Sequence, residues 1–139
     1  MDSAAIGELR EDEVEAAVAL WHATGLTRPW NDPHADAYRA LSLPASTILA
    51  ARHAGKLAGT AMVGHDGHRG WVYYLGVAVE YRRQGIGMSL MQAAEKWCID
   101  RGIPKVQLMI RTDNEAVRHF YEALGYEMAD VIVMGRRID

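Results

Sequence analysis

The chain changes from a strand pattern to a helix pattern at the run Tyr81-Arg82-Arg83-Gln84-Gly85-Ile86-Gly87. Before this run, residues 71–79 are rich in aromatic and β-branched side chains, which favours a β-strand. After it, residues 85–101 place apolar side chains at helical spacing, and Gly102 predicts the end of that helix. A helix N-terminus carries backbone N–H groups without partners and the positive end of the helix dipole. The run therefore predicts a strand-to-helix loop that is suited to receive a phosphate group.

Two interpretations of this loop are open from its residues. In the first, Gly85 and Gly87 let a ligand approach the backbone closely, while Arg82 and Arg83 add positive charge, so that the loop cradles a pyrophosphate. In the second, it is an ordinary strand-to-helix turn with surface arginines. Two common nucleotide motifs are excluded, because Leu90 stands where a dinucleotide fingerprint needs a third glycine and no Gly-Lys-Ser/Thr sequence is present.

Upstream of the loop, the pattern predicts a strand, two helices and an antiparallel meander of three strands. Asp12 and Glu15 have the spacing of a capping box, which predicts the start of the first helix, and Gly25 predicts its end. The two prolines of residues 26–33 exclude regular structure there. The expected elements are a strand at 5–10, helices at 12–24 and 34–43, and strands at 46–53, 56–65 and 71–79.

Downstream, the pattern predicts a strand at 104–110, a helix and a last strand at 126–137. The helix begins after Asn114, which is a good N-cap, and ends at Gly125. The complete order is β-α-α-β-β-β-α-β-α-β. A meander joined to two strand–helix units predicts an α/β fold with a mixed, mostly antiparallel sheet flanked by helices.

The composition favours one globular domain over residues 1–139. The 139 residues are 50% hydrophobic, and 15 Lys+Arg against 18 Asp+Glu give a formal net charge of −3. Nucleic-acid binding needs clustered positive charge, so no nucleic-acid partner is expected. The chain begins without a signal-peptide pattern, and no apolar stretch approaches the ~20 residues of a membrane helix. We therefore expect a cytoplasmic protein that does not associate with membranes.

The remaining reactive side chains do not form a metal site or a nucleophile in the sequence. His65 and His68 flank a turn without a third ligand nearby, so no metal is expected. Cys98 is the only cysteine and lies on the apolar face of the helix at 85–101, which favours a core role.

Two motifs together resemble those of the GNAT acetyltransferase superfamily. The first is Arg82-x-x-Gly85-x-Gly87, and the second, about thirty residues later, consists of Asn114, the pair Phe120-Tyr121 and Gly125-Tyr126. The run Leu75-Gly76-Val77-Ala78-Val79 is similar to the strand that lies beside the cofactor in that family. The segments Arg28-Pro29-Trp30-Asn31-Asp32-Pro33 and Asp66-Gly67-His68-Arg69-Gly70 also resemble those of a small bacterial subgroup, the YpeA-type proteins.

The resemblance implies a GNAT-like fold and acetyl-CoA as the donor. The cofactor pyrophosphate would contact the backbone of residues 83–88, and the pantetheine arm would lie along residues 75–77. The strand would bulge, helped by Gly76, and splay away from 104–110. The N–H of Val77 would stabilise the oxyanion, and Tyr121 would protonate the departing thiolate. The expected cofactor-binding residues are Leu75, Gly76, Val77, Arg82, Arg83, Gln84, Gly85, Ile86, Gly87, Met88, Asn114 and Tyr121.

The acceptor is expected to be an amine on a small molecule or a peptide. The chain has Met109 where N-terminal acetyltransferases of ribosomal proteins carry a glutamate, so the general base stays open among loop residues and water. Candidate substrate contacts are Trp30, Asn31, Asp32, Asp66 and His68. A homodimer is common in the superfamily. The alternative function is a non-catalytic domain that binds acyl-CoA as a sensor.

Overall fold

The computed structural model describes residues 4–139, which form two compact units that meet in sequence between Met109 and Ile110. The expectation of a single domain over residues 1–139 stays a prediction.

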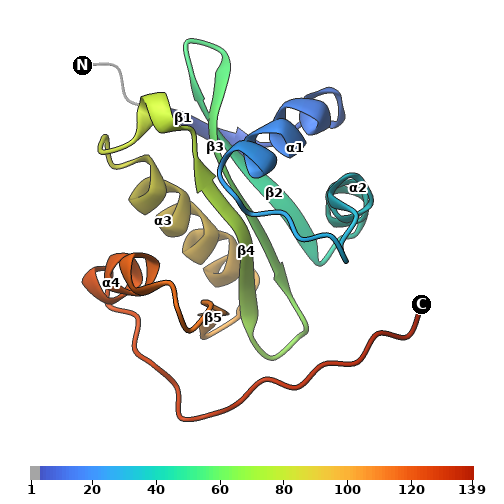
Figure 1. Cartoon of the computed structure of the whole chain (residues 1–139), viewed down its shortest axis with the longest axis vertical. Helices are drawn as coiled ribbons and strands as arrows, with labels where there is room; N and C mark the ends of the chain where they lie inside the picture. The colour runs from blue at the N-terminus through green and yellow to red at the C-terminus, as the bar shows by residue number, and fades with distance from the viewer. Residues whose placement is uncertain (1–3) are drawn as a thin grey trace. The chain divides into compact units, whose positions relative to one another are not determined.

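The first unit contains a five-stranded sheet in which the strands follow one another in sequence order (Figure 1). The strands are β1 (Ala5–Glu8), β2 (Ser46–His53), β3 (Lys56–His65), β4 (Gly70–Val77) and β5 (Val106–Leu108). Neighbouring strands from β1 to β4 are antiparallel, and β5 is parallel to β4. The predicted mixed, mostly antiparallel sheet is thus confirmed, although the first and fifth strands are shorter than the expected 5–10 and 104–110.

Helices cover both faces of this sheet. They are α1 (Val14–Ala23), α2 (Pro33–Ser42) and α3 (Ile86–Ile99), with single 3-10 turns at η1 (Glu11–Glu13) and η2 (Val79–Tyr81). A Cβ atom placed on Gly59 of β3 would meet Leu90 of α3 at 3.1 Å, whereas the next residue, Thr60, accepts a hydrogen bond from Trp21 of α1. Adjacent strand residues point to opposite faces, so α1 and α3 lie on opposite sides of the sheet.

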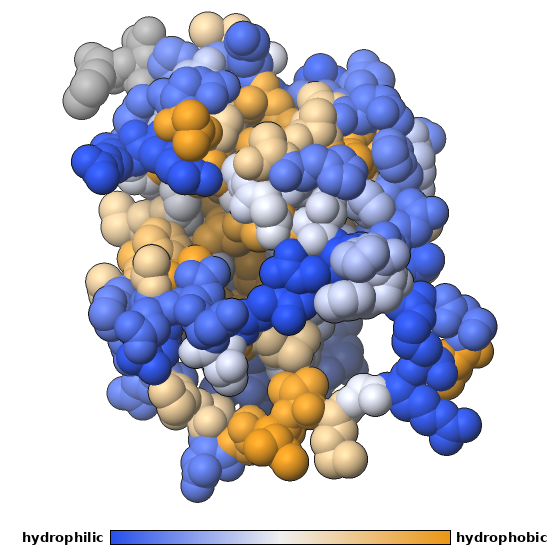
Figure 2. Space-filling model, in the orientation of Figure 1, coloured by the Kyte–Doolittle hydropathy of each residue, from blue (hydrophilic) through white to orange (hydrophobic). Residues whose placement is uncertain are grey.

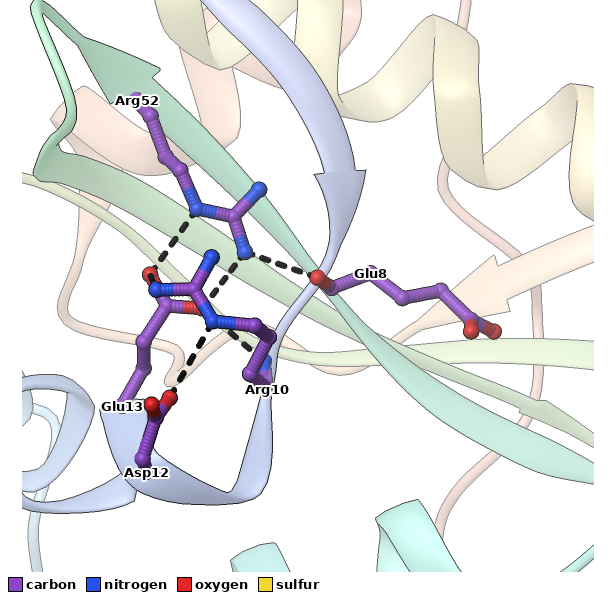
Figure 3. Close-up of polar contacts among 5 residues, drawn as sticks. All are labelled: Glu8, Arg10, Asp12, Glu13 and Arg52. Atoms are coloured by element: carbon purple, nitrogen blue, oxygen red, sulfur yellow. Dashed lines mark hydrogen bonds and ion pairs between the residues drawn. The ribbon is translucent and has the colours of Figure 1, made fainter.

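The predicted capping box of Asp12 and Glu15 is wrong, because the first helical turn is η1 (Glu11–Glu13), whose N-cap is Arg10. Glu13 accepts from the backbone N–H of Arg10 at 2.9 Å, and Asp12 instead accepts from the Arg10 side chain. Arg52 of β2 donates through Nε to Glu13 at 2.8 Å and through Nη2 to the carbonyl of Glu8 at 2.8 Å (Figure 3). The hydrogen bonds from Arg52 lower the pKa of Glu13 to about 2. Arg52 therefore links η1 to β1 and β2.

Cys98 lies in the core of the first unit, as its place on the apolar face of α3 predicted. Its side chain is buried, and burial raises the pKa of its thiol. A Cβ atom at Gly70 of β4 would overlap Cys98 Sγ. The thiol therefore packs directly against the start of β4, and only glycine leaves room for it there.

The second unit consists of α4 (Glu115–Ala123) and the segments on either side of it. Asn114 is the N-cap, as predicted, and its side chain accepts from the N–H of Val117 at 3.3 Å. The expected strand at 126–137 is wrong: these residues contain neither helix nor strand. A strand forms only when a neighbour satisfies its backbone groups, and the apolar pattern that suggested one does not specify that neighbour.

The segment after α4 is therefore exposed despite its apolar character. Six of its large hydrophobic side chains are between 65% and 93% exposed: Met128, Val131, Ile132, Val133, Met134 and Ile138. Figure 2 shows hydrophobic surface along this segment.

Candidate functional site

The N-terminus of α3 has the features that the sequence predicted for an anion site. Gly85 is the N-cap and adopts a left-handed conformation with φ of 78°, which costs glycine little. It provides no side-chain cap, and the first turn of α3 contains no acidic residue. A Cβ atom at Gly85 would meet no other atom within 4 Å. Because the first N–H groups of a helix lack intrahelical acceptors, α3 presents donors and positive potential at an open surface.

The loop before α3 is connected to the end of β4. Arg82 donates from Nε to the carbonyl of Val77 at 3.3 Å. Arg83 adopts a left-handed conformation with φ of 65°, which is uncommon for a residue with a side chain. Most side chains of the predicted phosphate loop are exposed, namely those of Arg82, Arg83, Gln84 and Met88, whereas Ile86 is buried in the core.

β4 separates from β5 halfway along its length. The parallel pairing ends at Val72 and Leu108. Among the described residues, β3 is therefore the only strand that pairs with residues 73–77. That edge leaves backbone groups available to an extended ligand. The predicted cofactor segment, residues 75–77, lies in this separated part of the strand.

The bulge expected in this strand occurs at Tyr74, two residues before Gly76. The register with β3 shifts between Thr60 and Met62, and Tyr74 adopts a left-handed conformation with φ of 51°. A Cβ atom on Gly76 would lie 2.8 Å from the side chain of Leu26. Gly76 therefore allows the loop after α1 to pass close to the strand.

The predicted acid, Tyr121, is buried within α4. Its ring makes edge contacts with Phe120 and Tyr126, at centroid distances of 5.1 and 5.8 Å. Burial raises the pKa of its phenol to about 12. Asn114 and Tyr121 belong to the second unit, whereas the predicted phosphate loop and residues 75–77 belong to the first.

Two of the predicted acceptor contacts, Asp66 and His68, lie on the turn between β3 and β4. Asp66 accepts from the N–H groups of His68 and Arg69 at 2.9 and 2.8 Å, and these bonds lower the pKa of its carboxyl group. The turn adjoins Gly70, which is five strand residues, or about 16 Å, from Leu75. The structure thus places Asp66 and His68 near the opposite end of β4 from the phosphate loop.

The other predicted acceptor contacts, Trp30, Asn31 and Asp32, are exposed in the loop before α2. Asp32 is the N-cap of α2 and accepts from the N–H of Ala35 at 3.1 Å. The loop therefore leads directly into a capped helix.

Sequence reasoning missed Tyr74 and Asp36. Tyr74 Oη donates to Asp36 Oδ2 at 2.7 Å, and burial together with this carboxylate raises the pKa of the Tyr74 phenol. The two residues are 38 positions apart, and neither belongs to a motif. No local signal could have paired them.

The described residues contain no candidate metal cluster and no candidate membrane-spanning helix. No group of three His, Cys, Asp or Glu side chains within residues 4–139 is placed to hold a metal ion. In the same residues, no helix combines the length and apolar character needed to cross a membrane.

Comparison with known proteins gives consistent matches. The model of the acetyltransferase (GNAT) family matches residues 9–126. An acetyltransferase of Pectobacterium atrosepticum is 46% identical over 129 residues, which cover 93% of this chain and 92% of that protein. One of Sodalis glossinidius is 47% identical over 130 residues, with the same coverage of both chains. Among solved structures, an aminoglycoside N-acetyltransferase in complex with CoA shares the fold, with a TM-score of 0.84, 18% identity and coverage of 99% and 97% of the two chains.

Proposed function

The chain belongs to the acetyltransferase (GNAT) family, and from this premise we propose that it transfers the acetyl group of acetyl-CoA to a primary amine. The amine attacks the thioester carbonyl directly, through a tetrahedral intermediate. Within the family, the segments around Trp30 and His68 support membership of the YpeA-type subgroup.

The observation that carries the proposal is the open N-terminus of α3. Gly85 leaves the first N–H groups of the helix without a side-chain cap, and Arg82 and Arg83 are exposed nearby. A pyrophosphate carries the negative charge that this arrangement favours. We assign the pyrophosphate of CoA to residues 83–88.

The separated part of β4 supports the binding of the pantetheine arm and the thioester. Residues 75–77 follow the bulge, and β5 no longer pairs with them. An extended pantetheine arm could hydrogen-bond to this edge as a strand does. We assign the N–H of Val77 to the thioester oxygen, where it would stabilise the negative charge that develops in the intermediate.

Tyr121 is the proposed acid for the leaving thiolate. When the nitrogen–carbon bond forms and the carbon–sulfur bond breaks, the thiolate takes a proton from Tyr121 Oη. The proton that the amine nitrogen loses passes to a carboxylate of the acceptor loops or to water, and the phenolate of Tyr121 is reprotonated from solvent. The pKa of about 12 keeps this phenol protonated at neutral pH, so its proton is available to the thiolate. The thiol that forms has a reference pKa of about 8.5. Asn114 uses its side-chain oxygen as the N-cap of α4, and we assign its amide N–H groups to the pantetheine arm.

The loop of residues 26–33 is the proposed acceptor site. It adjoins β4 at Gly76, close to the residues assigned to the thioester, and it carries Trp30, Asn31 and Asp32. Asp66 and His68 are the second set of candidates, because their turn lies at the other end of β4. The aminoglycoside N-acetyltransferase among the structural neighbours makes small amines the first acceptors to test.

Calorimetric titration and a thiol-release assay together test this function. We expect the protein to bind CoA and acetyl-CoA, and to release free thiol from acetyl-CoA with at least one amine from a panel of aminoglycosides, polyamines, amino acids and peptides with free N-termini. Absence of CoA binding would contradict the proposal. Binding without turnover across the whole panel would favour the sensor function.

A further inference from the structure

A strained tyrosine forms the bulge of β4. Tyr74 has φ of 51°, which side chains rarely adopt, and it occurs where one residue of β3 faces two residues of β4. Such a conformation persists only where the surrounding contacts determine it, and it is enriched at functional sites. The residues proposed to hold the thioester, 75–77, follow directly.

Two buried residues hold the backbone and the ring of Tyr74. Thr60 donates from Oγ1 to the carbonyl of Tyr74 at 2.9 Å and accepts from Trp21 Nε1 at 2.8 Å. The rings of Trp21 and Tyr74 stack with centroids 4.0 Å apart and an angle of 17°. Trp21 and Thr60 are both fully buried, so these contacts connect the bulge to the core.

The phenol of Tyr74 connects the bulge to α2. Its hydrogen bond to Asp36 Oδ2 is 2.7 Å long, and Arg39 donates to the other oxygen of Asp36 at 3.2 Å. The acceptor loop before α2 is therefore held against β4 at two places. Leu26 packs against Gly76 at its beginning, and Asp36 binds Tyr74 just beyond its end.

We propose that Tyr74 and Asp36 are positioning residues, whose hydrogen bond fixes residues 75–77 and the acceptor loop relative to each other. This inference rests on the proposed function, because that function assigns the thioester to residues 75–77. The bond acts through the backbone of β4 and through α2, and neither side chain reacts. Its loss would displace the strand edge that binds the pantetheine arm, while the phosphate loop and the N-terminus of α3 would keep their structure.

Binding of two ligands separates a positioning role from a general structural one. Acetyl-CoA contacts both the strand and the phosphate loop in the proposed complex, whereas its nucleotide half, phosphoadenosine diphosphate, contacts only the loop. Tyr74→Phe keeps the stack on Trp21 and removes the hydrogen bond. We expect it to weaken acetyl-CoA binding about 5-fold by calorimetry, as the loss of one hydrogen bond implies, and to leave nucleotide binding unchanged. Tyr73→Phe, at an exposed neighbour on the same strand, is the matched control.

Variants of Asp36 test the same bond from its other end. Asp36→Ala should weaken acetyl-CoA binding as Tyr74→Phe does. Asp36→Asn should restore it, because an amide oxygen also accepts a hydrogen bond from the phenol. Asp36 is partly exposed, so these variants test the proposal even if Tyr74→Phe fails to fold.

The possible results distinguish this inference from the proposed function. An unchanged ratio of acetyl-CoA to nucleotide affinity in the folded Asp36→Ala variant overturns the positioning role and leaves the proposed function intact. Equal loss in Asp36→Ala and Asp36→Asn also overturns it, because the hydrogen bond would then not be the cause. Failure of the unmodified protein to bind acetyl-CoA overturns the proposed function itself.

Discussion

The first motif of the chain includes the N-terminus of α3 and the second spans α4, yet the two N-termini satisfy backbone donors in different ways. At α4, the side chain of Asn114 accepts from the N–H of Val117, and Glu115 adds an acidic group to the first turn. At α3, Gly85 supplies no side chain and the first turn has no acidic residue. A helix whose donors are capped has little need of an external anion, whereas one capped by glycine leaves them for a ligand.

The two helices also differ in packing. Six residues of α3 are buried, including Leu90 and Trp97, whereas Tyr121 is the buried residue of α4. α3 therefore provides a rigid base for the proposed phosphate site. In α4 the burial concerns one side chain, that of the proposed acid Tyr121, and its effect is to keep the phenol protonated.

The largest expected effect is on the open end of α3. Gly85→Glu adds bulk and negative charge there, and the loss of two charge-assisted hydrogen bonds should weaken CoA binding about 1,000-fold by calorimetry. Gly102→Glu, at the other end of α3, is a matched control, because Gly102 has φ of 74° and equally open surroundings. Equal effects of the two variants would show that backbone strain and not the phosphate site is responsible.

Tyr121→Phe tests the buried side chain of α4. The phenol hydroxyl is removed and the ring contacts stay, so turnover with an active amine should fall on the order of 100-fold in steady-state assays. CoA affinity should change less than about 2-fold, since the phosphate contacts are assigned to another helix. Turnover equal to that of the unmodified protein would exclude Tyr121 as the acid.

The pH dependence of stability compares one ion pair of the first unit with one of the second. The Glu13 side chain is 11% exposed and its pKa is about 2 when folded, against roughly 4.3 for an unperturbed glutamate. Its contribution to stability is therefore complete above about pH 4.5 and is lost as the pH falls toward 2. Glu13→Gln should lower the free energy of unfolding by about 2 kcal/mol at pH 6 and by much less near pH 2.5, as measured by urea denaturation.

The control for this pH dependence is Glu122 of α4. Its pair with Arg118 has a distance of 3.8 Å, and both side chains are at least 40% exposed. Exposed pairs contribute little, so Glu122→Gln should change the free energy of unfolding by less than about 0.5 kcal/mol at either pH. If Glu13→Gln lowered the free energy of unfolding equally at both pH values, the result would contradict a stabilising role for the ionised form of Glu13.

The smallest effect concerns the cap of α4. Asn114→Ala makes this N-terminus similar to that of α3 and should lower stability by about 1 kcal/mol in the same denaturation assay. Asn114→Asp should restore it, because aspartate is an equally good N-cap. An unaffected Asn114→Ala variant would show that the side-chain cap does not distinguish the two helices.

Most elements of the first unit were predictable because their signals are local. The strand patterns at 46–53 and 56–65 predicted β2 and β3, and helical spacing of apolar residues indicated α3. The expected strand at 126–137 was wrong because pairing depends on a distant partner. The sequence predicted a bulge helped by Gly76 but did not indicate Tyr74, because distant contacts hold Tyr74 in the left-handed conformation.

The sequence by itself determined the family, the positions of both motifs and the glycine at the start of α3. These depend on residues within a few positions of one another, where capping, turn chemistry and hydrophobic periodicity act. Only the tertiary structure decided that Tyr74 is left-handed and that Asp36 binds it. Such contacts join side chains that are distant in the chain, so they exist only once the sheet and helices have packed together.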